Sequence, residues 1–135
     1  MERKYCDWNE FEEGCQILAE QIKPSLSLYK SIYGEPRGGL CVAVRLSHLL
    51  GLPLVMEPEE DSLVVDDIAD TGHTMSSYDD KDVAVLYKKF SCDKEPKYYA
   101  WETCRWVIFA WEFGINYEKD REKYLRRIGN ENGEG

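Results

Sequence analysis

The chain of 135 residues is 43% hydrophobic and 32% charged, which is ordinary for one globular domain with a buried core. Acidic residues outnumber basic residues by 26 to 17, so the formal net charge is −9, and this balance argues against a protein that binds nucleic acid. No apolar run reaches the ~20 residues of a membrane-spanning helix, and Met1–Tyr5 lacks the apolar core of a signal peptide. We therefore expect a cytoplasmic protein that binds neither nucleic acid nor a membrane.

The first half of the chain alternates helical and extended patterns. Apolar residues at helical spacing predict a helix over Trp8–Ile22. A short strand is expected at Ser31–Tyr33, and the Gly- and Pro-containing segment Gly34–Gly39 is typical of a loop. A second helical pattern over Leu40–Leu50 ends at Gly51, a residue suited to the end of a helix.

The second half begins with strands. Strands are predicted at Leu52–Met56, at Ser62–Val65 and at Val83–Tyr87, with a brief helix at Thr74–Tyr78. The charged stretch Glu118–Ile128 is predicted to be a helix. Two aromatic-rich stretches, at 98–101 and 106–113, lie between the last predicted strand and this helix and have no clear periodicity.

This alternation of helices and strands is typical of an α/β domain with a mostly parallel sheet flanked by helices. We expect a single domain over residues 1–128 and a disordered tail at 129–135. In such sheets ligands bind beyond the carboxyl ends of the strands. Two loops follow predicted strands in this way, one at Gly34–Gly39 and one after Val65.

The segment after Val65 combines two kinds of ligand group. Asp66, Asp67 and Asp70 supply carboxylates, which suit ribose hydroxyls or a hard cation. Residues Thr71–Thr74 can present consecutive N–H groups and two hydroxyls to one anion at the start of a helix. The alternative is a solvated acidic turn in which Asp70 caps the helix. The complete arrangement from 63 to 74 favours a sugar-phosphate site.

The string Val64–Thr74 (VVDDIADTGHT) resembles the signature with which type I phosphoribosyltransferases bind 5-phosphoribosyl 1-pyrophosphate (PRPP). Its similarity extends furthest toward the bacterial xanthine-guanine members of that family. Ser31–Leu40 is similar to their pyrophosphate loop, and Trp8–Ile22 looks like their first helix. Lys88 and the pair at 106–107 resemble their purine-contacting residues. The resemblance covers residues 5–114.

The resemblance implies a phosphoribosyltransferase fold and a purine-salvage enzyme. Such a glycosyltransferase moves the 5-phosphoribosyl group from PRPP to a 6-oxopurine (guanine, xanthine or hypoxanthine), which gives a nucleoside monophosphate and pyrophosphate. Arg37 and Gly38 would hold pyrophosphate. Asp66 and Asp67 would contact the ribose hydroxyls, and Asp67 would help to place Mg²⁺.

The same resemblance assigns the rest of the site. Asp70 would be the general base beside the purine imidazole. Lys88 would contact the 6-oxo group, Trp106 would stack on the ring, and the backbone of Val107 would contact the 2-substituent. The PRPP-binding loop would comprise Ile68, Ala69, Asp70, Thr71, Gly72, His73 and Thr74.

One departure from the family pattern limits these expectations. In the resembling enzymes a long, mobile, basic flap precedes the signature strand, whereas here only the acidic stretch Glu57–Asp61 occupies that place. We therefore expect a phosphoribosyltransferase fold with a truncated flap, or hood. If a second subunit covers the site instead, we expect a homo-oligomer, a dimer or larger. The stretch Tyr98–Phe113 is a candidate for that contact, although burial in the core explains it equally well.

Two functions therefore stay open. The first is the purine phosphoribosyltransferase, and retention of Asp70, Lys88 and Trp106 favours it. The second is a module that binds PRPP or a nucleotide without efficient turnover, as a sensor or partner subunit, and the missing flap favours it. A phosphatase or hydrolase with an acidic loop is a weaker third alternative. The carboxylates would suit such an enzyme, but the phosphate cradle at Thr71–Thr74 that follows them is not typical of it.

Overall fold

The computed structural model describes residues 2–70, 73–92, 94–112 and 126. Thr71, Gly72, the predicted helix Glu118–Ile128 apart from Arg126, and the predicted tail at 129–135 lie outside the described residues. Among the described helices, none combines the length and apolar character that a membrane crossing requires.

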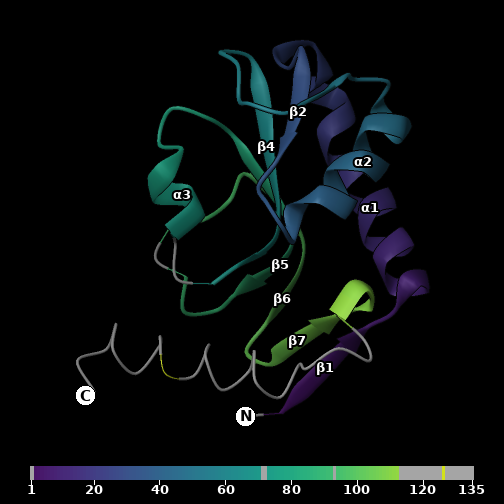
Figure 1. The fold of residues 1–135 in the computed structure, drawn as a ribbon, viewed down its shortest axis with the longest axis vertical. Helices are drawn as coiled ribbons and strands as arrows, with labels where there is room; N and C mark the ends of the chain where they lie inside the picture. Colours follow the sequence, from purple (N-terminus) through teal and green to yellow (C-terminus); the bar gives the residue numbers. More distant parts are fainter. Residues whose placement is uncertain (1, 71–72, 93, 113–125, 127–135) are drawn as a thin grey trace.

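A five-stranded sheet forms the centre of the molecule (Figure 1). All of its neighbouring strands are parallel, in the order β3-β2-β4-β5-β6. The strands are β2 (Ser31–Gly34), β3 (Leu54–Val55), β4 (Ser62–Ala69), β5 (Val83–Lys89) and β6 (Tyr98–Thr103). The expectation of a mostly parallel sheet flanked by helices is confirmed.

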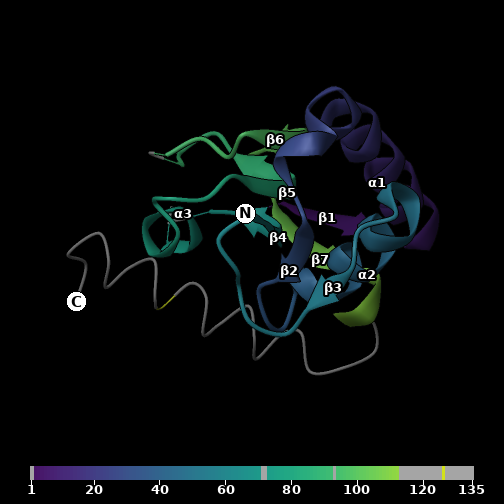
Figure 2. The ribbon, with the colours of Figure 1, turned by 90° about the horizontal axis from the view of Figure 1, so that it is seen from above.

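Helices cover both faces of the sheet, as the view from above shows (Figure 2). Helix α1 (Trp8–Ile22) and helix α2 (Gly39–Leu50) lie on one face, and the short helix α3 (His73–Ser77) lies on the other. A 3₁₀ segment, η1 (Lys23–Leu28), follows α1. The α1 helix starts where expected because the side chain of Asp7 accepts a hydrogen bond from the Glu10 N–H at 2.9 Å.

Two hydrophobic clusters fix these helices. Fully burying a leucine or isoleucine side chain stabilises the fold by about 1.5–3 kcal/mol relative to exposing it. The larger cluster packs α1 and α2 on the sheet and includes Leu18, Ile22, Leu46, Leu63 and Leu86. The smaller cluster packs α3 on the opposite face and includes Val64, Met75, Val83 and Val85.

A second, two-stranded sheet lies below the first in Figure 1. Strand β1 (Arg3–Cys6) pairs in parallel with β7 (Trp106–Phe109), which leads into the 3₁₀ turn η2 (Ala110–Glu112). Aromatic contacts join this sheet to the start of α1, and the rings of Phe109 and Trp111 stack with their centroids 4.9 Å apart. The other contacts in this group pair Trp8 with Phe11, Trp8 with Trp111 and Phe11 with Trp111.

Three predicted strands have wrong boundaries. Strand β5, predicted to end at Tyr87, continues to Lys89. Strand β4 does not end at Val65 but continues to Ala69, because its ladder to β5 extends to the pair Ala69↔Lys88. The strand predicted at Leu52–Met56 forms only at Leu54–Val55, because Pro53 has no N–H to donate and β2 is its one partner in the ladder.

The connection from β3 to β4 is short, as the truncated flap predicts. Residues 56–61 return to the amino-terminal edge of the sheet, where the Asp61 carbonyl accepts a hydrogen bond from the Lys30 N–H at 2.9 Å. The Glu60 carbonyl is contacted there by the ammonium of Lys81 at 3.3 Å. The connection therefore stays at the amino-terminal edge of the sheet and does not pass over the carboxyl ends of its strands.

Candidate functional site

Two of the predicted binding segments meet at the carboxyl end of the sheet. The loop after β2 is attached to β4, because the Glu35 N–H donates to the Val65 carbonyl at 2.8 Å. The approach at Gly38 is closer still: a Cβ atom added there would lie 2.0 Å from Oδ2 of Asp67. A Cβ atom added at Gly39 would lie 2.4 Å from the Val65 carbonyl oxygen. At Gly39 the clash would be with the backbone, so only glycine allows the approach there; at Gly38 a side chain would force the Asp67 carboxylate to turn away.

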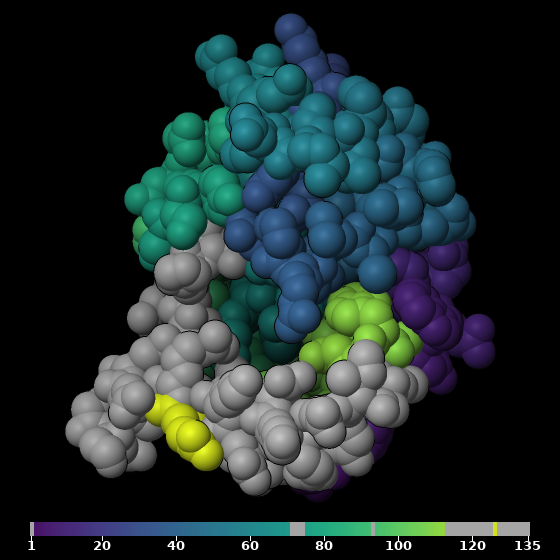
Figure 3. All heavy atoms as spheres, in the orientation of Figure 1, coloured from purple at the N-terminus to yellow at the C-terminus, as the bar shows by residue number. Residues whose placement is uncertain are grey.

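In the space-filling view, a hollow opens below this loop (Figure 3). The blue loop after β2 borders it above, the light-green η2 turn borders it on one side, and the dark-teal end of β4 forms its floor. Arg37 is exposed at this loop, and the Pro36–Arg37 peptide bond is cis.

The paired carboxylates at the end of β4 have unusual surroundings. Asp66 accepts a hydrogen bond from the Asp67 N–H, and Asp67 accepts one from the Ile68 N–H, both at 2.8 Å. Burial raises the pKa of Asp67 well above its ordinary value, and the neighbouring charges of Asp66 and Glu112 raise it further. A cation bound here would relieve that repulsion.

These carboxylates fit a magnesium ion. Mg²⁺ usually keeps several waters and binds one or two protein carboxylates together with substrate phosphates. Within the described part of the chain there is no group of three or more side chains that would hold a metal without such help. Asp66 and Asp67, next to a loop suited to phosphate, supply the donor type and number that Mg²⁺ prefers.

Asp70 lies at the same edge, half-buried, and interacts electrostatically with a lysine from the neighbouring strand. This lysine is Lys89, whose ammonium donates to the Arg105 carbonyl and interacts electrostatically with Asp70. Burial lowers the pKa of Lys89, and the charge of Asp70 acts in the opposite direction. Lys89 thus connects Asp70 with the residue that precedes Trp106.

Lys88, the predicted purine-contacting lysine, has different neighbours. Its ammonium lies 3.3 Å from Glu95 and 3.6 Å from Glu102. It also lies 5.7 Å from the centre of the Tyr99 ring. These contacts hold the Lys88 charge among acids of the β5–β6 region, whereas the electrostatic interaction with Asp70 belongs to Lys89.

The remaining predicted residues form four pairs. Ile68 and Ala69 form the end of β4, and Trp106 and Val107 open β7, where they pair with Arg3 and Lys4. His73 and Thr74 begin α3. Thr71 and Gly72 lie outside the described residues, so their predicted contact with phosphate remains a prediction.

Sequence reasoning missed two residues of this site. Glu112 follows β7 in η2, where its carboxylate accepts a hydrogen bond from the Phe109 N–H at 2.9 Å and adds to the negative charge near Asp67. Lys89 was obscured by Lys88, because every residue of β5 is buried and the strand has no polar–apolar alternation to show which lysine faces the site.

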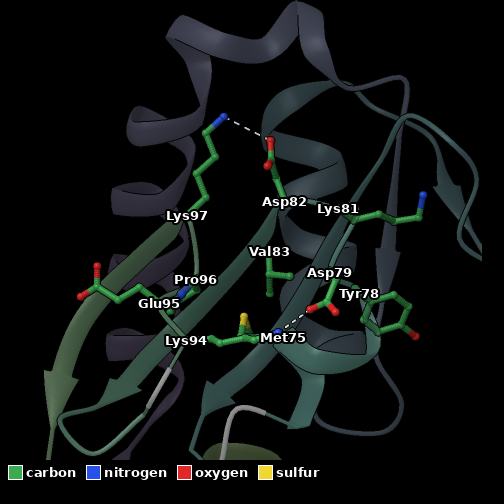
Figure 4. A pocket seen from close by; sticks show the side chains of 10 residues that line it. All are labelled: Met75, Tyr78, Asp79, Lys81, Asp82, Val83, Lys94, Glu95, Pro96 and Lys97. Atoms are coloured by element: carbon green, nitrogen blue, oxygen red, sulfur yellow. Dashed lines mark hydrogen bonds and ion pairs between the residues drawn. The ribbon is translucent and has the colours of Figure 1, made fainter.

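A pocket of about 530 Å³ lies elsewhere, between the segments that lead into β5 and β6 (Figure 4). Two ion pairs join these segments, Lys94–Asp79 at 2.5 Å and Lys97–Asp82 at 3.1 Å. Because its lining residues mostly precede the two strands, this pocket is separate from the carboxyl-end hollow described above.

A scan against protein-family models and a search of curated proteins found no match for the chain. Solved structures did match. A purine phosphoribosyltransferase from Pyrococcus horikoshii Ot3 is 29% identical, with a TM-score of 0.72 over 83% of this chain and 95% of that one.

Two further structures share the fold. The xanthine-guanine-hypoxanthine phosphoribosyltransferase of Helicobacter pylori is 19% identical, with a TM-score of 0.73 over 87% of this chain and 97% of its own. A hypothetical protein from Neisseria gonorrhoeae, solved with bound ppGpp, is 19% identical, with a TM-score of 0.68 over 89% and 94% of the two chains.

Proposed function

Because the chain belongs to the type I phosphoribosyltransferase family, we propose that it transfers the 5-phosphoribosyl group of PRPP to a 6-oxopurine base. The products would be a purine nucleoside monophosphate and pyrophosphate. The observation that carries this proposal is the contact between Gly38 and Asp67, because it joins a phosphate-type loop to a pair of carboxylates at one sheet edge. The family resemblance of the two loops and the Pyrococcus relative support it.

On the PRPP side, the loop that carries Arg37 and Gly38 would hold the pyrophosphate, and the segment from Ile68 to Thr74 would hold the 5-phosphate. Asp66 and Asp67 would bind the ribose hydroxyls. Mg²⁺, held with the help of Asp67, would neutralise charge on the leaving pyrophosphate. The raised pKa of Asp67 supports this role, because a carboxylate crowded by other acids gains most from a bound cation.

On the purine side, Asp70 would act as the general base that takes the proton from the imidazole nitrogen. We assign the contact with the 6-oxo group to a lysine of β5, for which Lys88 and Lys89 are the two candidates. The neighbours of the two lysines favour Lys89. Trp106 would stack on the base, and the Val107 backbone would contact its 2-substituent.

A second candidate function is a PRPP- or nucleotide-binding protein with slow turnover. The short connection at 56–61 favours it, since this segment stays at the amino-terminal edge and does not cover the opposite edge. A site open to water shields the ribosyl cation poorly and allows water to capture it.

The decisive experiment measures product formation from PRPP with guanine, xanthine and hypoxanthine in turn, with and without Mg²⁺. The transferase predicts a nucleoside monophosphate and an equal amount of pyrophosphate, only when Mg²⁺ is present. The binding protein predicts thermal stabilisation by PRPP with little or no nucleotide product. Absence of both product and stabilisation would contradict both functions.

A further inference from the structure

Glu35 has a place that the proposed reaction does not explain. It is the first residue of the loop after β2, and both of its backbone groups form hydrogen bonds there. Its N–H donates to the Val65 carbonyl at 2.8 Å, and its carbonyl accepts from the Gly39 N–H at the same distance. Its Oε2 atom is buried and has no hydrogen-bond partner among the residues that the structure describes. A carboxylate held in this way needs a compensating contact on its other oxygen.

The partner comes from beyond the other phosphate loop. Tyr78 directly follows α3, the helix that starts at the predicted 5-phosphate loop. Burial raises the pKa of the Tyr78 hydroxyl, and side-chain hydrogen bonds with Glu35 and Tyr33 raise it further. The rings of Tyr33 and Tyr78 lie 6.1 Å apart, and both pack on the cluster around Met75. In Figure 4 the Tyr78 ring, which borders that pocket, points away from the Lys94–Asp79 pair.

From this arrangement we infer that Glu35 and Tyr78 form a positioning pair that holds the pyrophosphate loop and the 5-phosphate loop at a fixed separation. Glu35 lies between Tyr33 on β2 and Arg37 in the loop, so a contact that fixes its side chain also restrains the positions of Arg37 and Gly38. Tyr78 closes the helix that follows the other loop. The inference rests on the proposed function, because it concerns a ligand that contacts both loops.

This role makes a distinction between ligands. PRPP carries a phosphate at each end and must contact both loops together, whereas inorganic pyrophosphate contacts one loop. If the separation of the two loops is fixed before the ligand binds, the entropic cost of ordering the loops on binding is lower, and only PRPP gains from this. The contact joins a hydroxyl to a charged group, and losing such a contact weakens affinity by about tenfold.

The test compares Tyr78→Phe, Glu35→Gln and the double variant with the wild-type chain, by calorimetric titration with Mg²⁺ and either PRPP or pyrophosphate. We expect the Kd for PRPP to rise about tenfold in each single variant and by no more in the double variant, since one contact is lost in all three. The Kd for pyrophosphate should change less than about twofold. In the transfer assay, KM for PRPP should rise while kcat stays within about twofold.

Tyr29→Phe is the matched control. It also removes a buried hydroxyl, which contacts Asp82 at 2.5 Å and Tyr98 at 2.8 Å, but at the opposite edge of the sheet. It should lower Tm without changing either Kd. If the wild-type chain binds PRPP and the Tyr78 and Glu35 variants bind it equally tightly, or lose pyrophosphate to the same extent, the positioning pair is overturned and the proposed function stands. If the wild-type chain binds no PRPP, the proposed function fails, and the pair with it.

Discussion

Substituting Gly38 by alanine tests the centre of the site, because the closest approach between the two binding segments occurs there. The new methyl group would lie 2.0 Å from Oδ2 and 2.5 Å from Cγ of Asp67. Both distances are far below van der Waals contact, so the Asp67 carboxylate must turn away. A carboxylate at the end of a rotatable side chain can do so, and the loss of stability should therefore be small, about 1 kcal/mol.

The loss of binding should be much larger. The displaced carboxylate gives up its contacts with the ribose and the cation, and one lost contact to a charged group is worth roughly 1.5–3 kcal/mol. This corresponds to a Kd about 10 to 100 times higher. In the wild-type chain, PRPP at 100 times its Kd adds about 2.7 kcal/mol to the free energy of unfolding, or about 10 °C in Tm. At the same PRPP concentration, Gly38→Ala with a Kd raised 100-fold should keep about 0.4 kcal/mol of this.

Thermal unfolding with and without PRPP and Mg²⁺ measures both effects. Gly51→Ala is the control, because it changes a glycine at φ 69° with no atom near its added Cβ. It should cost about 1–2 kcal/mol through the left-handed backbone alone and keep the full shift on adding PRPP. If Gly38→Ala kept the same PRPP shift as Gly51→Ala, the contact between Gly38 and Asp67 would have no part in ligand binding.

Three further substitutions test single roles. Asp70→Asn should retain PRPP binding and lower kcat by about 10²–10⁴-fold, as loss of a general base does; unchanged kcat would exclude Asp70 as the base. Asp67→Asn should raise the Tm of the ligand-free protein at pH 7. The folded-state pKa of Asp67 lies above its unfolded value of about 4, so the stability of the wild-type chain falls as pH rises from the unfolded pKa to the folded pKa. The increase in Tm should vanish near pH 3, and the variant should lose the Tm shift on adding PRPP and Mg²⁺. Lys89→Met should raise KM for the purine base more than the matched variant Lys88→Met; the reverse order would restore Lys88 as the purine contact.

The helices could be predicted to the residue where local chemistry sets their ends. Helix α1 spans Trp8–Ile22 as expected, because the Asp7 cap and the apolar stripe act within a few turns of each other. Gly51 adopts the left-handed conformation expected after α2. No long-range contact was needed to find either end.

The strands were harder because their partners are distant in the sequence. Strand β1 (Arg3–Cys6) carries no alternating pattern, and it forms only through its ladder to Trp106–Phe109 at the other end of the described chain. Asp66 and Asp67 are poor strand formers, yet pairing with β5 keeps them in β4. Tertiary contacts override local preference in both cases.

The choice between Lys88 and Lys89 could not be made from the sequence for a geometric reason. In a regular strand, successive side chains alternate between faces. In β5, however, the consecutive residues Leu86 and Tyr87 both pack in the same hydrophobic cluster. The alternation is therefore interrupted just before the two lysines, and counting along the strand does not give the side on which either one lies.

The short β3–β4 connection bears on both candidate functions. It is held at the amino-terminal edge by hydrogen bonds from Lys30 and Lys81, so moving it over the site would break contacts on two other segments. Closure by this connection would require that part of the sheet edge to open. The binding groups at Gly38, Asp67 and Asp70 do not depend on such closure, since the sheet strands β2, β4 and β5 hold them in place. The short flap should therefore leave the affinity for PRPP intact. It should instead lower the rate of transfer relative to the rate of hydrolysis.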